Sequence, residues 1–395
     1  MSSLALNMIV AAGESEILDR CLDSFDAREF FDEIVIVNTS NDGKIDEVAK
    51  TYDAKLIRRI WDDDFSAARN AALDNTESDY IMWLDSDDVC LEQFQHKIKN
   101  VRKVITDNNR GVEAFFFPYC VQLDEHLNST ISFLRERIFK RCSLFRWEFP
   151  VHERICRDWT NVKRGIMPEF QITHLPMKPQ ETSAERNLRI LRKYLDSEEG
   201  RYADPQLRFF YGRDLMMSSD VEGGIAKLDT IINELDSDDM TLYMASWYCM
   251  MWFAYGGHEA RPASDAFNKD NEVLIEQYAR LSIAFSNSYA EPYVVLGDLY
   301  AQRGMLLEAK RLYETALRKK INTGGIQAEP YYEELPAERL SKLHIIDGDY
   351  DRALFYNGRA LKHNDTNSKL LNDRRFILQH EEGDLNERYS QNKTA

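Results

Sequence analysis

Three carboxylates and one serine follow an apolar run of the chain, at Asp85-Ser86-Asp87-Asp88. The run before them, residues 80–84, has the length and composition of a buried strand. A strand in an open α/β sheet delivers its last residues to the crevice where ligands bind. Carboxylates crowded there repel one another unless a cation lies among them. Because Mg²⁺ and Mn²⁺ take oxygen ligands and leave places for phosphate oxygens, the pattern indicates a metal that holds a diphosphate.

The same residues have a simpler interpretation. Ser86, Asp87 or Asp88 could cap the N-terminus of a helix expected over residues 91–105. An Asp-x-Asp pattern is common, and on the triplet alone the helix cap is favoured. The strand before it and the segments described below favour the metal.

The elements that must position these residues alternate between strands and helices. Short apolar runs predict strands at residues 4–11, 33–37, 54–60, 80–84, 111–123, 135–145 and 170–174. Helical spacing of apolar residues predicts helices at residues 14–25, 45–52 and 65–75. Such alternation indicates an α/β fold with a mostly parallel sheet and right-handed crossovers. We assign this domain to residues 1–180.

The second half of the chain has the pattern of long amphipathic helices, and we expect an all-α domain at residues 181–380 and a flexible tail at 381–395. The spacing of Tyr293, Leu296, Gly297, Tyr300 and Gly304 resembles a tetratricopeptide repeat, in which small residues let two antiparallel helices pack closely. Further copies are expected at residues 205–235 and 348–360. An ordinary helical bundle is the alternative.

Composition restricts the partners and the compartment. The chain has 50 Lys and Arg against 67 Asp and Glu, a net charge of −17, which disfavours non-specific binding to nucleic acid or an anionic membrane. No run approaches the ~18 apolar residues of a membrane span. The six cysteines are scattered without a Cys-x-x-Cys pair, as expected of reduced thiols in a cytoplasmic protein.

Four segments, taken in order, carry a resemblance to a known family. They are residues 7–14 with 20–24, residues 33–39, residues 61–72 and residues 83–88. Together, residues 4–175 resemble the family 2 glycosyltransferases, which have the GT-A fold. The resemblance implies that Ala11, Glu14 and Asn38 contact the base and ribose of a nucleotide-sugar. The family usually has Asp at the position of Asn38, and a turn residue is an equal alternative there.

The third and fourth segments imply the diphosphate and metal contacts. By resemblance, Asp64 lies at the base and Arg69 near the diphosphate, to which an arginine can bind bidentately. Asp64 could instead cap the following helix, and Arg69 could pair with Asp62 or Asp63.

The family pattern makes Asp87 the direct ligand of Mn²⁺ or Mg²⁺ and groups Asp85 and Ser86 with the nucleotide-sugar contacts. His174, after the last predicted strand, corresponds to a further metal ligand, although a lone histidine is more often structural.

A fifth segment, with Arg137 and Phe139 before Val151-His152-Glu153, resembles a subgroup that includes the sublancin-type peptide S-glycosyltransferases. That subgroup also carries a tetratricopeptide-like region. Inverting transfer needs a base to take the proton of the acceptor, and Glu153 or His152 could serve. We prefer Glu153, because His152 could be a packed structural histidine.

The resemblance therefore implies an inverting, metal-dependent glycosyltransferase that uses a nucleotide-sugar, with a UDP-sugar the first expectation. A peptide or protein acceptor comes first, since repeats present concave surfaces. A surface glycan comes second, and a hydroxymethylated nucleic-acid base, which the net charge disfavours, comes third. A nucleotidyltransferase is a weaker alternative, because residues 11–15 lack the glycine-rich, basic loop of such enzymes. A non-catalytic interaction protein is the rival of another class, and the presence of Asp85 and Asp87 argues against it.

Overall fold

The computed structural model describes residues 2–108, 110–124, 126–155, 158–176, 183–197, 204–234, 237–257, 267–321 and 327–391. Internal contacts divide the chain into two compact units, residues 1–224 and residues 225–395. The boundary predicted near residue 180 lies outside the described residues and stays a prediction.

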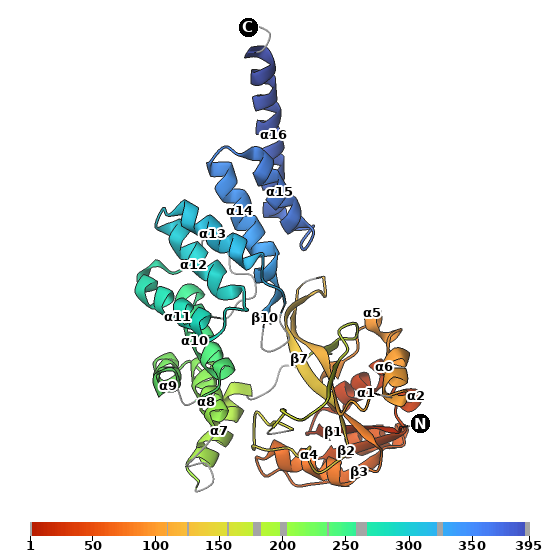
Figure 1. Ribbon diagram of the computed structural model, residues 1–395. Helices are drawn as coiled ribbons and strands as arrows, with labels where there is room; N and C mark the ends of the chain where they lie inside the picture. Colours follow the sequence, from red (N-terminus) through yellow and green to blue (C-terminus); the bar gives the residue numbers. More distant parts are fainter. Residues whose placement is uncertain are drawn as a thin grey trace. The chain divides into compact units, whose positions relative to one another are not determined.

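The first unit alternates strands and helices as the sequence predicts (Figure 1). Its strands are β1 (Leu4–Val10), β2 (Glu33–Asn38), β3 (Lys55–Arg58), β4 (Tyr80–Asp85), β5 (Asp88–Val89), β6 (Ala114–Leu123), β7 (Ser129–Lys140), β8 (Arg164–Ile166) and β9 (Ile172–His174). Its helices are α1 (Ser15–Ser24), α2 (Ala27–Phe30), α3 (Gly43–Thr51), α4 (Phe65–Asp74), α5 (Glu92–Gln95), α6 (Ile98–Thr106), α7 (Ser183–Leu195) and α8 (Pro205–Met217).

The strands form a mixed, mostly parallel sheet in the order β3-β2-β1-β4-β7-β6-β9-β5, with β8 beside β6. The pairs β1–β2, β1–β4 and β2–β3 are parallel, whereas β7 runs antiparallel to β4 and to β6. This arrangement confirms the predicted α/β class. Because β1, β2 and β4 are parallel, their carboxyl ends meet at one edge of the sheet, which is where ligands bind in such folds.

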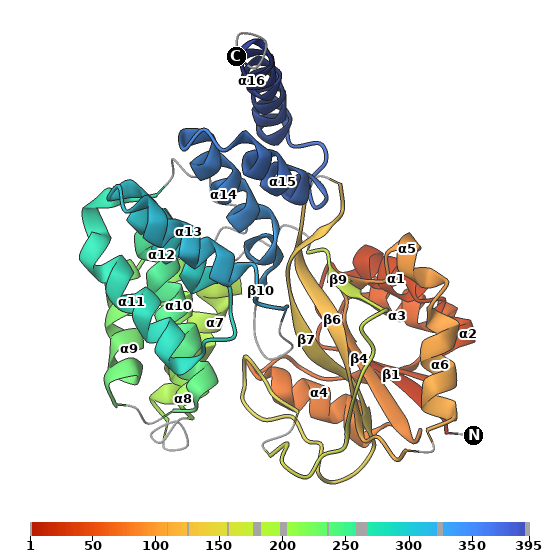
Figure 2. The same ribbon diagram turned by 45° about the horizontal axis from the view of Figure 1, so that its top comes forward.

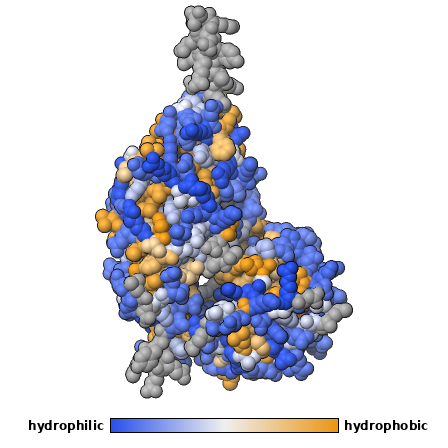
Figure 3. Space-filling model, in the orientation of Figure 1, coloured by the Kyte–Doolittle hydropathy of each residue, from blue (hydrophilic) through white to orange (hydrophobic). Residues whose placement is uncertain are grey.

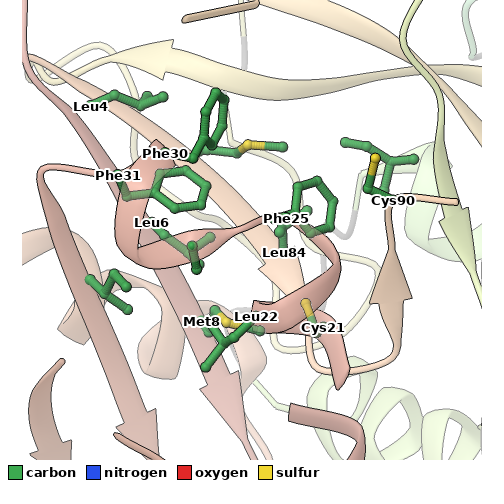
Figure 4. Packing of buried hydrophobic residues seen from close by; sticks show 14 of the residues in the cluster. Leu4, Leu6, Met8, Cys21, Leu22, Phe25, Phe30, Phe31, Leu84 and Cys90 are labelled. Atoms are coloured by element: carbon green, nitrogen blue, oxygen red, sulfur yellow. The ribbon is translucent and has the colours of Figure 1, made fainter. Parts of the chain in front are cut away.

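Helices cover both faces of this sheet, with α4 on one face and α1, α3 and α6 on the other (Figure 2). Alternate residues of each strand point to opposite faces. Leu4, Leu6 and Met8 of β1 pack with Leu22 and Phe25 on the α1 face (Figure 4). The intervening residues face α4, where Ile9, Val35 and Val37 pack on Ala68 and Ala72. Burial on both faces explains why these strands are apolar almost throughout.

Four features of the first unit differ from the prediction. The helix expected over residues 91–105 is broken into α5 and α6. The strand β8 and the short helix α2 were not expected. The strand β5, only two residues long, lies directly after the acidic turn and pairs with β9. Its position decides the geometry of the site.

The second unit is helical. Its elements are α9 (Val221–Glu234, which begins just before the division), α10 (Asp239–Tyr255), η2 (Lys269–Asn271), α11 (Glu272–Phe285), α12 (Glu291–Gln302), α13 (Leu306–Ala316), β10 (Gln327–Ala328), η3 (Glu329–Tyr332), α14 (Glu334–Ile346), α15 (Tyr350–Leu361) and α16 (Ser368–Gln391). Consecutive helices from α10 to α16 pack on one another. The helix α16 continues into the segment predicted as a tail, of which residues 392–395 lie outside the described part.

The α12–α13 pair explains the residues that resemble a tetratricopeptide repeat. A Cβ added to Gly297 would lie 2.4 Å from the ring of Tyr313, so only glycine permits this approach of the two helices. Gly304 turns the chain between them in the left-handed conformation, with φ +75°. Gly348, with φ +72°, does the same between α14 and α15. The all-α, repeat-like character of this region is thus confirmed.

Hydrophilic residues predominate on the face of the molecule seen in Figure 3, and apolar residues occur there in separate groups. Among the described residues, no helix combines the length and the apolar composition that crossing a membrane requires.

Candidate active site

The acidic turn joins two strands. Asp85 ends β4, Ser86 and Asp87 form the turn, and Asp88 begins β5. The helix α5 begins further on, and the residue at its N-cap, Leu91, makes no side-chain cap bond. The helix-cap interpretation of this triplet is therefore wrong. The pairing of β5 with β9 places Asp88 directly opposite His174.

Asp88 is fully buried and holds the turn in place. Its Oδ2 accepts the backbone N–H of Asp85 at 2.9 Å and lies 2.9 Å from Nη1 of Arg137. Its Oδ1 accepts the hydroxyl of Tyr119 at 2.9 Å. A buried carboxylate with a cation and two hydrogen-bond donors is well compensated. Asp88 thus fixes the direction in which its neighbours point.

Asp87 and His174 meet beside Asp88. Nδ1 of His174 lies 3.3 Å from Oδ1 of Asp87 and 3.7 Å from Oδ1 of Asp88. This nitrogen is buried and has no partner in hydrogen-bond geometry among the described residues. One ligand atom from each of the three side chains lies within 4.8 Å of the others. Carboxylate oxygens and an imidazole nitrogen are ligand atoms that a divalent cation such as Mn²⁺ can take.

The electrostatics of His174 agree with this arrangement. Burial alone lowers the pKa of the imidazole, but the neighbouring Asp87 and Asp88 raise it to about 10. In the absence of a metal the imidazole is therefore protonated and neutralises part of the acidic charge. A cation at the same place would take over that neutralisation and release the proton.

A β-bulge aims Arg137 at the acidic turn. Phe115 and Phe116 are successive on β6, but they pair with Ile138 and Glu136, so Arg137 is the extra residue of β7. The guanidinium of Arg137 is fully buried. It lies 3.9 Å from the ring centre of Trp83 and 4.1 Å from that of Tyr119. Two aromatic faces and Asp88 therefore hold this cation.

On the α4 face of the sheet, Arg69 joins two carboxylates. Its Nη2 lies 2.6 Å from Asp85, and its Nε lies 2.6 Å from Glu153. The guanidinium lies beside the edge-to-face pair of Trp83 and Trp147, 4.6 and 5.1 Å from their ring centres. Burial would raise the pKa of Asp85, but the charge of Arg69 holds it well below its usual value. Asp85 therefore stays ionised at neutral pH.

This arrangement differs from the alternative considered for Arg69. Asp62 pairs instead with Arg59, and Asp63 pairs with Arg189. The guanidinium of Arg69 already binds the carboxylates of both Asp85 and Glu153. Its predicted contact with a diphosphate remains a proposal.

Glu14 connects the β1 edge to the acidic turn. Its Oε2 accepts the backbone N–H of Ala11 at 2.8 Å and the hydroxyl of Ser86 at 2.9 Å. Burial raises the pKa of Glu14. Ala11 itself is exposed at the carboxyl end of β1. The predicted residues Ala11, Glu14 and Ser86 are thus brought together with Asp85 at one edge of the sheet.

Two other predicted nucleotide contacts have local structural roles. Asn38 is fully buried, donates to the carbonyl of Asp42 and to Asp46, and accepts twice from Ser40. Both polar atoms of its side chain are thus used to shape the loop after β2. Asp64 caps α4 by accepting from Ala67 N–H at 2.9 Å. The structure shows for each residue the alternative role that the sequence left open.

His152 also has a structural environment. Its Nε2 lies 2.8 Å from Asp214 of α8, and its ring stacks on Phe210 at 4.1 Å. Burial lowers the pKa of His152, with a further contribution from Arg213. The side chain that reaches the cluster around Arg69 is that of Glu153, only 10% exposed.

Sequence reasoning missed Asp88 and Arg137 as site residues, together with Tyr119. Arg137 was quoted only as part of a resemblance, and Asp88 only as the third acid of the turn. The sequence held two signals for these residues. One is the group of three acids on either side of Ser86, and the other is the position of Arg137 directly before the apolar residues 138 and 139 of a strand. A cation buried at such a position requires a buried acid.

Comparisons with known proteins agree with the class of fold. Residues 8–157 match the model of the family described as glycosyl transferase family 2. The chain thus contains a family 2 glycosyltransferase domain with a GT-A-like sheet, followed by a tetratricopeptide-like helical region.

Among curated proteins, the chain is 24% identical over 231 residues to the SPbeta prophage-derived glycosyltransferase SunS of Bacillus subtilis. That match covers 57% of this chain and 52% of SunS. It is 39% identical over 177 residues to a TPR repeat-containing protein of Synechococcus elongatus, covering 45% of this chain and 41% of that protein. The chain thus spans about half the length of the curated relatives it matches.

Among solved structures, residues 1–349 of S. aureus TarS match 82% of this chain and 95% of the solved chain. The sequence identity is 12% and the TM-score is 0.35, so no functional argument rests on this similarity.

Proposed function

We propose that the protein is an inverting, metal-dependent glycosyltransferase that moves a sugar from a nucleotide-sugar, with a UDP-sugar the first expectation, to an acceptor. One observation carries the proposal. At the ligand-binding edge of a family 2 domain, Asp87, Asp88 and His174 converge on one point, and the imidazole nitrogen there has no hydrogen-bond partner among the described residues.

On the donor side, Ala11, Glu14 and Ser86 line the edge where β1 and β4 end. In the proposal they contact the nucleoside of the donor, as Asp85 does from the other side of the turn. Asn38 and Asp64 act indirectly, because their side chains hold the loop after β2 and the start of α4. Arg69 keeps Asp85 ionised and adds a positive charge near the diphosphate.

Asp87 and His174 would hold Mn²⁺ or Mg²⁺, while Asp88, already occupied by Arg137 and Tyr119, keeps the turn in position. Such an ion stabilises the negative charge that grows on the departing nucleoside diphosphate. The role of the protein is to present Asp87 and His174 at a fixed spacing, and the β5–β9 pairing provides this spacing.

Glu153 is our candidate for the base that takes the proton of the acceptor. Its carboxylate lies on the α4 face, separated from Asp85 by one guanidinium. Arg69 orients it through the 2.6 Å contact, and a carboxylate held in this way is positioned to accept a proton. His152, hydrogen-bonded to Asp214 and covered by Phe210, is less suited to that task.

For the acceptor, a peptide or protein is the first proposal, with a surface glycan second and a hydroxymethylated nucleic-acid base third. Stacked helical repeats offer extended surfaces that suit a peptide. The net charge of −17 disfavours nucleic acid. A non-catalytic role on the same scaffold is the competing proposal.

A donor screen tests the proposal. The full chain is mixed with Mn²⁺ or Mg²⁺ and a panel of UDP-, GDP-, CMP- and dTDP-sugars, and thermal stability and donor hydrolysis are followed with and without EDTA. We expect a metal-dependent stabilisation and slow hydrolysis with one class of donor. If no donor stabilises the protein or is hydrolysed, the non-catalytic role is favoured.

A further inference from the structure

We propose that the hairpin of α7 and α8 is a working part of the active site, because Asp214 of α8 holds, through His152, the loop that presents Glu153. This inference rests on the proposed function, in which Glu153 is the base. It makes His152 and Asp214 positioning residues, and it extends the catalytic machinery beyond residues 8–157, which match the family model.

The loop that carries Glu153 is short and closed. A bridge between Glu148 and Arg154 joins its ends, with backbone N–H···O distances of 2.9 and 3.2 Å. Inside it, Phe149 and His152 adopt left-handed backbone conformations, with φ of +75° and +53°. Residues other than glycine rarely do so unless the surrounding structure enforces it. The contacts of the loop must therefore supply that constraint.

Successive side chains of the loop reach opposite partners. His152 contacts α8, Glu153 contacts Arg69 of α4, and Arg154 returns to Asp204, the N-cap residue of α8, at 2.8 Å. Val151 is buried in one apolar cluster with residues of α7 and α8, namely Ile190, Leu191 and Leu207. The hairpin thus contacts the loop both before and after Glu153.

The contact between His152 and Asp214 is a buried polar interaction between the loop and the hairpin. Asp214 is 1% exposed, and its second oxygen is bound by the guanidinium of Arg213 at 2.7 Å. Burial raises the pKa of Asp214, but Arg213 and His152 hold it below its usual value. Asp214 is therefore a charged, fixed acceptor for the imidazole N–H, and the ring stacked on Phe210 has one orientation available.

Two consequences follow. Without the acceptor, His152 loses its hydrogen bond to α8, and the backbone carrying Glu153 is free to leave the 2.6 Å contact with Arg69.

The hairpin α7–α8, which the sequence assigns to the helical domain, belongs by its internal contacts to the first unit. Its function in our proposal is to set the position of a catalytic carboxylate.

The test is a double-mutant cycle on the full chain, using hydrolysis of a UDP-hexose with Mn²⁺ as the probe. The variants are Asp214→Ala, Glu153→Gln and the combination, with Asp214→Asn as the conservative variant that keeps an acceptor oxygen. We expect Asp214→Ala to lower kcat about 10- to 100-fold with little change in KM, since misplacing a catalytic group by about 1 Å costs that much. Asp214→Asn should restore most of the loss.

The combination decides between positioning and a general structural role. If Asp214 acts through Glu153, adding Asp214→Ala to Glu153→Gln causes no further loss of kcat. A loss of the same size in both backgrounds would overturn the proposal. Ile45→Val, on the buried face of α3, is the control for loss of stability alone and should leave kcat unchanged. If Glu153→Gln itself leaves turnover intact, the assignment of the base fails instead.

Hydrogen exchange supplies a second readout that does not depend on turnover. Asp214→Ala should increase amide exchange in peptides covering residues 149–155, whereas Ile45→Val should not. Unchanged exchange of this loop in Asp214→Ala would overturn the positioning role even if the probe were hydrolysed too slowly to measure.

Discussion

Both units contain carboxylates that are largely buried, but the partners of these carboxylates differ. In the helical unit, Asp298 is 5% exposed and accepts the hydroxyls of Tyr255 and Tyr313, each at 2.7 Å, beside the guanidinium of Arg339. In the first unit, Asp87 is 22% exposed and faces an imidazole nitrogen that has no hydrogen-bond partner among the described residues.

This difference separates structure from chemistry. A carboxylate surrounded by donors fixed on helices has nothing left to offer a ligand, and its partners make the fold specific. A carboxylate that reaches solvent and is paired only with an imidazole can still bind a ligand. The comparison predicts that changes around Asp87 alter turnover and leave stability nearly intact. Changes around Asp298 should lower stability and leave turnover nearly intact.

The largest effect is expected for Asp87→Ala. Loss of this ligand should reduce metal-dependent donor hydrolysis by about 10³-fold, because stabilisation of the leaving diphosphate depends on it. The melting temperature without metal should stay near that of the wild type, and the stabilisation by Mn²⁺ should disappear. Asp62→Ala removes a carboxylate whose side chain is 52% exposed in the same unit and is the matched control. Full activity of Asp87→Ala would refute the metal assignment.

Arg339→Met should have the opposite signature. It leaves the charge of Asp298 buried without its cation, which costs about 3–5 kcal/mol of stability. Thermal unfolding followed by far-UV circular dichroism measures this loss, and kcat for donor hydrolysis at a temperature where the variant is folded should not change. Arg318→Met, on the exposed face near the end of α13, should cost far less. Equal losses in the two variants would mean that burial of the pair is unimportant.

A smaller effect concerns Glu291, fully buried near the start of α12, where it accepts the N–H of Ala328 at 2.9 Å. Burial raises its pKa to about 7 from an ordinary 4.5. Between these values the folded chain binds more protons than the unfolded chain, so stability falls as pH rises. The loss is complete above pH about 7 and amounts to about 3 kcal/mol.

Glu291→Gln removes this titration while keeping an acceptor for Ala328. The difference in melting temperature between the variant and the wild type should therefore grow in favour of the variant from pH about 4.5 to pH about 8. Measuring both proteins in the same buffers cancels the contribution of every other group. Parallel pH profiles would show that Glu291 is ionised in the fold throughout.

The fold could largely be predicted from the sequence because its signals are local. The strands β1, β2 and β4 are buried on both faces and are apolar almost throughout. The turn at Gly304 and the close approach at Gly297 each need a glycine. The strand β5 could not be predicted, since two residues carry no pattern and the strand exists only by pairing with β9.

The candidate site likewise contains residues that could be predicted from the sequence and residues that could not. The acidic turn could be found from adjacent residues, but the part played by Asp88 depends on Arg137 and Tyr119, which a bulge and a distant strand bring to it. Asn38 and Asp64 could not be decided from sequence, because loops and caps use the same residue types as ligand contacts do.

The pairing of β5 with β9 also has a consequence for the order in which the protein matures. The acidic turn is synthesised early, whereas its imidazole arrives with β9, after β6, β7 and β8 have been added. A nascent chain that ends before Ile172 has the carboxylates of Asp87 and Asp88 without His174. In the proposed metal site, both ligand side chains are therefore present only after β9 has been synthesised and has paired with β5.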